Sequence, residues 1–537
     1  MSSSEHDYLI VGGGSAGSVL AGRLSEQPHT SVVLLEAGGT GDSQLVKTPM
    51  GVVAMLPTRI NNYALETVPQ VGLNGRRGYQ PRGKGLGGSS AINAMVYIRG
   101  HRSDYDHWAS LGNTGWSYDE LLPYFLRSED NANLKDALHG QGGPLPVADL
   151  QTGNPFQKVY LDAARQAGFA VTRDFNGAEQ EGIGIHQVTQ KNGERWSAAR
   201  AYLHPHIGHR PNLQVVTGAQ TTRILFEGRR AVGVVCTHAG QEKIYRARKE
   251  VILSAGAFHT PQLLMVSGVG PAQHLSQVGV KVLHDLPGVG QNLQDHPDFI
   301  FGYAAKSLDL MGISLGGSVR MTREIIRYLR SRQGMLTSNF AEGGGFLKTD
   351  PSLVAPDVQL HFVVSLVEDH ARKLHTAHGY SCHVCVLRPK SRGQVTLTGP
   401  DMRQAPDIDP AFLQHEDDLE TLVKGFKLTR RLMDAPALAS LRHKDLFTAD
   451  IRTDDDIRAV LRARADSVYH PVGTCRMGVD AMAVVDPQLR VHGLQGLRVV
   501  DASIMPTLIG GNTNAATIAI ASTKSGKAIS TSTKRPT

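Results

Sequence analysis

A glycine pattern near the start of the chain constrains the fold most strongly. A short apolar run leads into Gly12-x-Gly14-x-x-Gly17, and after a helix-compatible stretch a second apolar run ends at Glu36. A strand, a glycine turn, a helix and an acidic residue about 20 positions further on make up the dinucleotide-binding βαβ unit. We therefore expect an α/β fold that contains a Rossmann-like nucleotide-binding domain.

Each residue of this pattern has a local physical role. Gly12 makes the tight turn, Gly14 lets the backbone approach a diphosphate, and Gly17 lets the helix pack closely against the strand. The diphosphate would bind the free amides of the helix N-terminus, and Glu36 would accept hydrogen bonds from ribose hydroxyls. The pattern predicts a nucleotide cofactor and leaves NAD and FAD both open.

A second glycine pattern, Gly83-x-Gly85-x-x-Gly88, has the same spacing in a different context. Pro81 stands where a strand should precede it, so the segment fails as a nucleotide fingerprint. We interpret it as a loop that brings backbone amides against a large flat or anionic ligand. With one complete fingerprint, the chain is expected to bind NAD or FAD, but not both.

Composition narrows the class of protein. A chain of 537 residues, 41% of them apolar, exceeds what one core usually supports, so two domains or one elaborated domain are expected. Four cysteines are too few for a disulfide scaffold and indicate a reducing, cytoplasmic setting. The net charge of +7 is scattered without a stripe of basic and aromatic residues, which argues against nucleic acid as a partner.

The chain lacks the patterns typical of membrane insertion. The N-terminus has no basic start with a long apolar middle, and no stretch approaches the roughly 18 apolar residues of a membrane span. The C-terminal stretch STKSGKAISTSTKRPT is polar and weakly basic. It predicts a frayed terminus, with contact to an anionic membrane surface as the alternative. We expect a cytoplasmic protein, with peripheral association at the inner membrane as the alternative.

His470, in the stretch VYHPVGTC, follows a segment that is expected to be helical. Thr453 and Asp456 have the spacing of a capping box at the start of that helix. Pro471 favours an extended backbone at His470. Taken alone, the stretch leaves three interpretations open: a catalyst, a metal ligand, or a core histidine satisfied by hydrogen bonds.

Two further patterns have the appearance of metal sites. Cys382-x-x-Cys385 lies in an alternating, strand-like pattern, in which positions three apart face opposite sides. The other is LHPHIGHRP, a Pro- and Gly-containing segment without nearby carboxylates, which is typical of a solvated loop. We therefore expect no metal site.

Four motifs together resemble a known family. GKGLGGSSAINAMVYIRG, GAFHTPQLLMVSGVG, YHPVGTCRMG and VVDASIMP…GNTNAAT are similar, in this order, to motifs of the glucose–methanol–choline oxidoreductases, which use FAD to oxidise alcohols. The nearest branch is the bacterial one that contains choline dehydrogenases and membrane-associated alkanol dehydrogenases. The resemblance implies FAD rather than NAD. It also implies oxidation of a primary alcohol by hydride transfer to flavin N5, with electrons passed to a quinone or another acceptor. An alcohol oxidase producing hydrogen peroxide, a choline dehydrogenase and a hydroxynitrile lyase remain alternatives.

The resemblance implies roles for individual residues. His470 would be the base, and Asn514 would donate a hydrogen bond to the substrate oxygen. Glu342 and Asn339 would lie near the substrate, although a buried structural carboxylate is the alternative for Glu342. Ile92 stands where some relatives carry the histidine that attaches FAD covalently, so non-covalent FAD is expected. The remaining positions implied to contact FAD are Gly12, Gly14, Ser15, Ala16, Gly17, Glu36, Ala37, Gly88, Ser89, Asn93, Ala94, Met95, Val96, Thr221, Asp501, Ala502, Asn512 and Thr513.

The expected domains are discontinuous. Residues 1–160, 200–300 and 460–537 would form the FAD-binding domain. Residues 161–199 and 301–459 would form a substrate-binding domain, in which alternating strands and amphipathic helices indicate an antiparallel sheet with helices.

Overall fold

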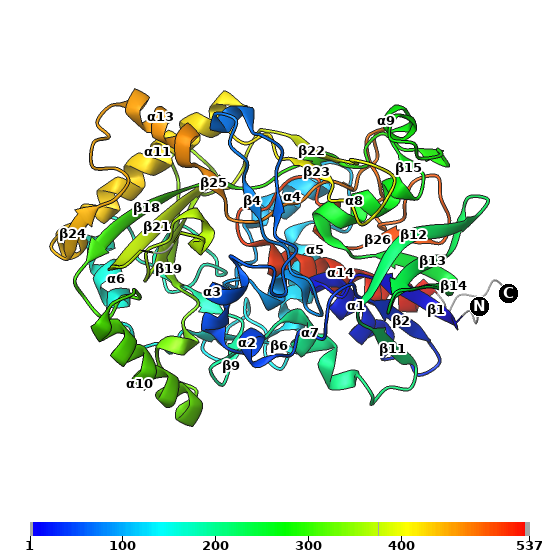
Figure 1. Cartoon of the computed structure of the whole chain (residues 1–537), viewed down its shortest axis with the longest axis horizontal. Helices are drawn as coiled ribbons and strands as arrows, with labels where there is room; N and C mark the ends of the chain where they lie inside the picture. The colour runs from blue at the N-terminus through cyan, green and yellow to red at the C-terminus, as the bar shows by residue number, and fades with distance from the viewer. Residues whose placement is uncertain (1–3, 374, 532–537) are drawn as a thin grey trace.

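A computed structural model describes residues 4–373 and 375–531, with only the helical backbone for residues 524–531. Figure 1 shows two lobes, each built around one large sheet. The terminal helix α14 (Thr513–Thr531) extends into the stretch expected to fray, and the rest of that stretch lies outside the described residues. No helix in the described ranges has both the length and the apolarity needed to cross a bilayer.

The first sheet carries the nucleotide fingerprint. Its predicted βαβ unit is confirmed: β1 (Ser4–Val11) and β2 (Val32–Leu35) pair in parallel, and α1 (Ser15–Leu24) connects them. β14 pairs in parallel with β1 and in an antiparallel manner with β13. Across the sheet, the described strands are β11 (Leu213–Val216), β2 (Val32–Leu35), β1 (Ser4–Val11), β14 (Gln241–Leu253), β13 (Arg230–His238) and β12 (Ala219–Glu227), with β26 (Leu497–Val499) against β14.

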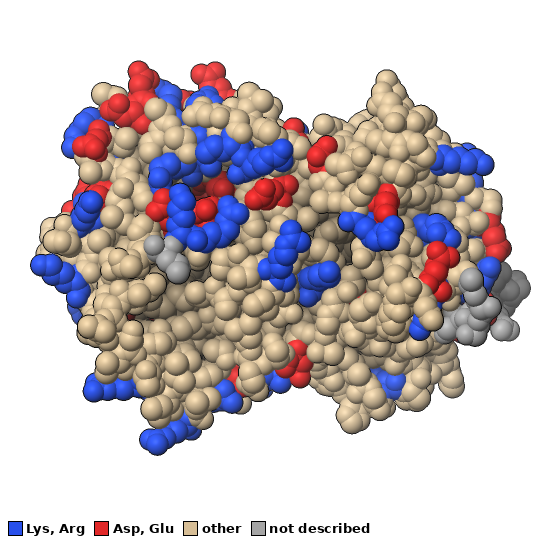
Figure 2. Space-filling model, viewed as in Figure 1, with Lys and Arg blue, Asp and Glu red and all other residues tan. Residues whose placement is uncertain are grey.

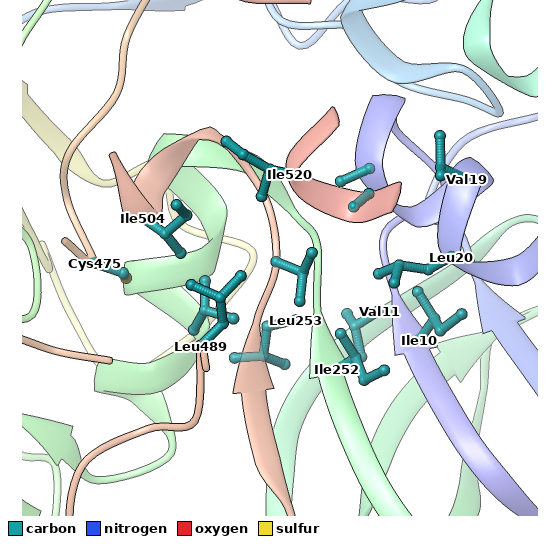
Figure 3. Close-up of a cluster of buried hydrophobic side chains, with 14 of the residues drawn as sticks. Ile10, Val11, Val19, Leu20, Ile252, Leu253, Cys475, Leu489, Ile504 and Ile520 are labelled. Atoms are coloured by element: carbon teal, nitrogen blue, oxygen red, sulfur yellow. The ribbon is translucent and has the colours of Figure 1, made fainter. Parts of the chain in front are cut away.

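Helices α1 (Ser15–Leu24) and α14 bury the central strands of this sheet. Figure 3 shows Ile10 and Leu253 of neighbouring strands beside Leu20 of α1 and Ile520 of α14. Every residue of β2 is buried, which explains why its sequence is a continuous apolar run and not an alternation of apolar and polar residues. The packing supplies a rigid support for the glycine turn that follows β1.

The second sheet is antiparallel, as the sequence predicted. Helices α11 (Glu416–Met433) and α6 (Phe156–Gln166) contact it through a separate apolar core. The described strands, in spatial order, are β24 (Arg442–Asp445), β18 (Pro297–Ala305), β21 (His378–Val386), β20 (Val358–Val363), β19 (Ala341–Leu347) and β7 (Gly182–Ile185), with β25 (Asp466–Ser467) against β18.

Two of the predicted domain boundaries fall inside these elements. Residue 160 lies within α6, and residue 300 lies within β18. Tyr160 and Phe299 are both buried in the core of the second sheet. The division into two domains stays a prediction, and these contacts favour placing both elements entirely in the second domain.

The two cysteines of the CxxC pattern lie in one strand but pack in different apolar clusters. In β21, Cys382 belongs to the core beneath the sheet, whereas Cys385 packs in a different cluster with Ile98 and Phe346. Within the described residues, no group of three or more His, Cys, Asp or Glu side chains could hold a metal ion.

Candidate active site

A cavity of about 1060 Å³ is lined by residues of both lobes. Of the residues predicted to form the site, all line this cavity except Gly17 and Glu342. The cavity therefore brings together Gly12, Gly14, Ser15, Ala16, Glu36, Ala37, Gly88, Ser89, Asn93, Ala94, Met95, Val96, Thr221, Asn339, His470, Asp501, Ala502, Asn512, Thr513 and Asn514.

The three glycines of the fingerprint meet different surroundings. A Cβ atom on Gly17 would lie 1.8 Å from the carbonyl oxygen of Gly12, so this position must be glycine for α1 to lie on β1. Gly12 has φ +99°, and a Cβ there would lie 2.5 Å from the carbonyl oxygen of Ser254. A Cβ on Gly14 would meet no atom closer than 3.9 Å. The opening in the turn therefore lies at Gly14, where α1 begins without a side-chain cap.

Glu36 ties the fingerprint to the second glycine loop. Its buried carboxylate accepts hydrogen bonds from the backbone N–H groups of Gly13 (2.8 Å), Gly38 (2.8 Å) and Gly85 (3.0 Å). Burial raises the pKa of Glu36, and the three backbone donors oppose that shift. The carboxylate thus fixes both glycine loops against the same end of the cavity.

The segment after the second glycine loop is irregular rather than helical or extended. Met95 has φ +60°, and its backbone N–H donates to Oδ1 of Asn93 at 3.0 Å. The buried side chain of Arg195 also donates to Asn93 Oδ1, at 3.0 Å. These bonds hold the loop from Asn93 to Val96 against the cavity.

Asp501 supports the opposite wall. Its carboxylate accepts from the backbone N–H of Gly256 (2.9 Å), the hydroxyl of Thr260 (2.6 Å), and the N–H and hydroxyl of Ser503 (2.8 and 2.5 Å). Burial raises the pKa of Asp501, against these four hydrogen bonds. Because its oxygens are engaged within the protein, Asp501 positions the adjoining Ala502 in the cavity wall.

His470 follows a capped helix and is held by a hydrogen bond from its own backbone. The predicted capping box is present at α13 (Asp454–Arg464): Thr453 and Asp456 exchange hydrogen bonds of 3.2 and 2.8 Å. Beyond this helix, the backbone N–H of His470 donates to Oδ1 of Asp295 at 2.7 Å. The His470 side chain is buried, with 9% exposure, and lines the cavity.

The hydrogen bonds around His296 assign the proton on His470. Nε2 of His296 lies 3.2 Å from the carbonyl oxygen of Leu387 and 3.1 Å from that of Ile509, so this nitrogen carries the proton. Nδ1 of the neutral His296 is then an acceptor, and it lies 2.9 Å from Nδ1 of His470. His470 therefore donates through Nδ1 and has its lone pair on Nε2.

The surroundings keep His470 neutral. Burial lowers its pKa well below 6.5, and the neighbouring His296 and the Arg82 guanidinium lower it further. Burial also lowers the pKa of His296 to about 3, so both rings are neutral at physiological pH. A neutral imidazole with its lone pair at the cavity can accept a proton from a bound hydroxyl.

The structure places Asn512, rather than Asn514, beside His470. Nδ2 of Asn512 lies 3.1 Å from Nε2 of His470, while its Oδ1 accepts from Gln359 at 3.0 Å. Oδ1 of Asn514 instead accepts from the hydroxyl of Ser15 at 2.7 Å, next to the fingerprint. The expectation for Asn514 as the partner of His470 is corrected, because α14 begins at Thr513 and its first turn directs Asn514 toward α1.

Glu342 does not reach the cavity. It is 1% exposed and accepts hydrogen bonds from Ser338 (2.6 Å), Thr152 (2.9 Å) and Gln157 (2.8 Å). Burial raises its pKa, and these donors oppose the shift. The expected substrate contact of Glu342 is therefore corrected to the alternative, a buried structural carboxylate. Asn339 does line the cavity, and its Nδ2 donates to the carbonyl of Ala94 at 2.8 Å.

Sequence reasoning missed Asp295 and His296. Both lie in NLQDHP, which has the same His-Pro pair as the stretch around His470. A second histidine followed by proline was the available signal, but nothing in the sequence alone places the two pairs together. His259 was also missed; it lines the cavity and packs on Tyr63 with ring centroids 4.4 Å apart.

Comparison with known proteins shows similarity to one family of oxidoreductases over most of the chain. The GMC oxidoreductase family models match residues 6–298 and 389–521. An alcohol dehydrogenase (acceptor) of Pseudomonas putida is 46% identical over 520 residues, covering 96% of this chain and 94% of the relative. The mitochondrial choline dehydrogenase of Homo sapiens is 43% identical over 533 residues, covering 97% and 89%.

Solved structures show the same fold over nearly the whole chain. The pyridoxine 4-oxidase of Mesorbium loti superimposes with a TM-score of 0.87 at 33% identity, covering 97% of this chain and 99% of that one. The formate oxidase of Aspergillus oryzae RIB40, in a structure concerned with FAD modification, gives a TM-score of 0.92 at 28% identity, covering 99% and 100%.

Proposed function

The chain belongs to the GMC oxidoreductase family, and we propose on this basis that it is an FAD-dependent dehydrogenase that oxidises a primary alcohol to the aldehyde. The observation that carries the proposal is the neutral His470, whose Nε2 lone pair lies at a cavity that also contains the nucleotide fingerprint. FAD, when bound, supplies the acceptor for the hydride that leaves the alcohol carbon.

The residues of the cavity fit FAD. The uncapped N-terminus of α1 offers amides to a diphosphate, and the open space at Gly14 admits it. Thr221 also lines this part of the cavity. Ser89, Asn93 and Asn512 would surround the ring system of the cofactor.

In this proposal, His470 and Asn512 both contact the substrate hydroxyl. Nε2 of His470 takes the hydroxyl proton, and the resulting imidazolium stabilises the negative charge that develops on oxygen. The amide Nδ2 of Asn512, which donates to Nε2 of His470 at 3.1 Å, would turn its N–H to the same oxygen when the alcohol binds, and it does not compete for the proton. His296 keeps Nδ1 of His470 protonated, so that the basic nitrogen is always the one at the cavity.

FAD is proposed to be bound without a covalent link to the protein. Ile92, which is buried, cannot form the bond that a histidine at this position would form. Acid precipitation of the purified protein should therefore release the flavin into the supernatant. Flavin absorbance that stays with the protein pellet would contradict the proposal.

The cavity favours an apolar alcohol over choline. Beyond the fingerprint its walls are mainly apolar, with Met311, Met321, Ile325, Leu336 and Val363. Its two lining carboxylates among the described residues, Glu36 and Asp501, are both engaged by backbone donors. A quaternary ammonium group would thus enter without an anionic partner, and burying an unpaired charge is unfavourable.

Anaerobic reduction tests the function and the substrate class together. Added 1-alkanols are expected to bleach the flavin absorbance, and choline is expected to do so only weakly. No bleaching by any alcohol would refute alcohol oxidation, whereas rapid bleaching by choline alone would overturn the substrate class. Admitting air afterwards separates a dehydrogenase, which stays reduced until a quinone is added, from an oxidase, which recovers its absorbance.

A further inference from the structure

Arg195, the last residue of β10 (Glu194–Arg195), is a fully buried cation. The residue is only 1% exposed. Figure 2 shows the ordinary situation of Lys and Arg: on that face of the molecule their charged groups lie at the surface, many of them beside an acidic group. Water and a neighbouring carboxylate are the two usual means of stabilising a guanidinium, and burial removes the first of them.

The charge of Arg195 has no negative partner in the described part of the chain. Arg99 is buried to the same extent, but it forms an ion pair with Glu129. Glu194, the neighbour of Arg195 in the chain, pairs with Arg200 instead. Burial lowers the pKa of Arg195 to about 9, and no acidic side chain opposes the shift. The guanidinium is therefore still protonated at neutral pH, as an uncompensated buried charge.

The hydrogen bonds of Arg195 orient this charge without neutralising it. Nε donates to the carbonyl of Val46 at 3.1 Å, and Nη1 donates to the carbonyl and to Oδ1 of Asn93 at 2.5 and 3.0 Å. The carbonyl of Ser90 lies 3.5 Å from Nη1, and Nη2 is buried without a partner among the described residues. All of these acceptors are neutral. A buried charge in this state destabilises the free protein unless negative charge from a ligand compensates it.

Asn93 connects Arg195 to the cavity. Its Oδ1 accepts from Nη1 of Arg195 and from the backbone N–H of Met95, each at 3.0 Å, which identifies the oxygen end of the amide. The other end, Nδ2, carries two N–H groups, and it forms no hydrogen bond to a described residue. Asn93 lines the cavity, whereas Arg195 lies behind this wall. The wall therefore presents a free donor that has a fixed positive charge directly behind it.

We propose that Arg195 stabilises negative charge on the bound FAD, and that it acts through Asn93, which it orients and polarises. A donor that is preorganised and backed by a cation favours an anion, and the low dielectric of a buried site strengthens the effect. Arg195 is a positioning residue, because it does not itself reach the cavity. The inference rests on FAD binding as in the proposed function, but not on the identity of the alcohol.

Two parts of FAD carry negative charge, and they differ in their thermodynamic effect. The diphosphate has the same charge in both redox states, so loss of its partner weakens the binding of oxidised and reduced FAD equally. The ring system gains negative charge only on reduction, so loss of its partner weakens the reduced form selectively and lowers the midpoint potential. The dissociation constant and the midpoint potential, measured on the same protein, therefore distinguish the two sources.

Arg195→Met removes the charge and keeps most of the apolar volume. If the diphosphate is the anion, the dissociation constant of oxidised FAD should rise roughly tenfold at an unchanged potential. If the ring system is the anion, the affinity for reduced relative to oxidised FAD should fall roughly tenfold, which equals a midpoint potential lower by about 30 mV for a two-electron couple. Arg195→Lys keeps the charge and should retain most of both quantities. Reconstitution of the apoprotein, followed by flavin fluorescence, and anaerobic equilibration with a reference dye measure them.

Asn93→Asp provides a second test, which does not require Arg195 to be removed. The carboxylate keeps an acceptor for Arg195 and for the N–H of Met95, and it supplies the missing negative partner. The apoprotein is therefore expected to melt at a higher temperature than the wild type. A lower melting temperature would show that the charge of Arg195 is already compensated in the free protein, and would overturn the inference.

Arg200→Met is the matched control. Arg200 donates to the carbonyl of Arg195 at 3.0 Å, but its charge is paired with Glu194 and it does not line the cavity. The same loss of one positive charge should leave both FAD measurements near the wild-type values. Equal changes in Arg195→Met and Arg200→Met, or wild-type values in Arg195→Met, would overturn the inference alone. A wild-type apoprotein that does not bind FAD would overturn the proposed function as well.

Discussion

His470→Ala is expected to leave FAD bound and to slow reduction of the flavin by an alcohol on the order of a hundredfold or more. The variant removes the nitrogen proposed to accept the hydroxyl proton, but not the glycine loops proposed to hold the cofactor. Stopped-flow absorbance without oxygen measures the reduction directly. Flavin content and thermal melting, recorded in parallel, show whether the fold and the cofactor survive.

A variant at Cys475 provides the matched control. Cys475 lies in the same stretch as His470 but is buried in the core of the first sheet, as Figure 3 shows. Cys475→Ala is expected to leave the rate of flavin reduction unchanged. Loss of FAD or of the folded state in His470→Ala would return His470 to the interpretation of a structural core histidine.

The first lobe was predictable because its signals are local. In the fingerprint, strand, turn and helix follow one another without a break, and Gly17 is required by the carbonyl of Gly12, only five positions before it. The capping box at Thr453 is local in the same sense. Such features depend on chain geometry over a few residues, so the sequence specifies them directly.

The partners of His470 could not be predicted in this way. His296 lies 174 residues before His470, and the two meet because β18 pairs with β25, with Pro297 opposite Ser467. Whether Asn512 or Asn514 lies beside His470 depends on the residue at which α14 begins, and the sequence alone does not give that residue. For Glu342, the deciding facts are tertiary: the pairing of β19 with β20 shifts register at this residue, and its carboxylate bonds to Ser338 and Thr152 whereas the neighbouring Ala341 lines the cavity.

His296→Leu is expected to slow flavin reduction by roughly tenfold to a hundredfold, the range in which residues that orient a functional histidine act. Leucine offers no acceptor to the Nδ1 proton of His470, so the ring is free to adopt the tautomer that protonates the cavity-facing nitrogen. It also removes the donor to the carbonyls of Leu387 and Ile509, at a cost of about 1–3 kcal/mol in stability.

His296→Asn separates positioning from packing. Asparagine can place Oδ1 near the position of Nδ1 and accept from His470, but it is too short to donate to both carbonyls. We therefore expect Asn to restore most of the reduction rate while its melting temperature stays near that of the Leu variant. Since His296 touches neither cavity nor substrate, the dissociation constant of the alcohol should change little in either variant. Equal losses of rate in the Leu and Asn variants would show that His296 supports the fold alone, and that His470 needs no partner to present Nε2 to the hydroxyl.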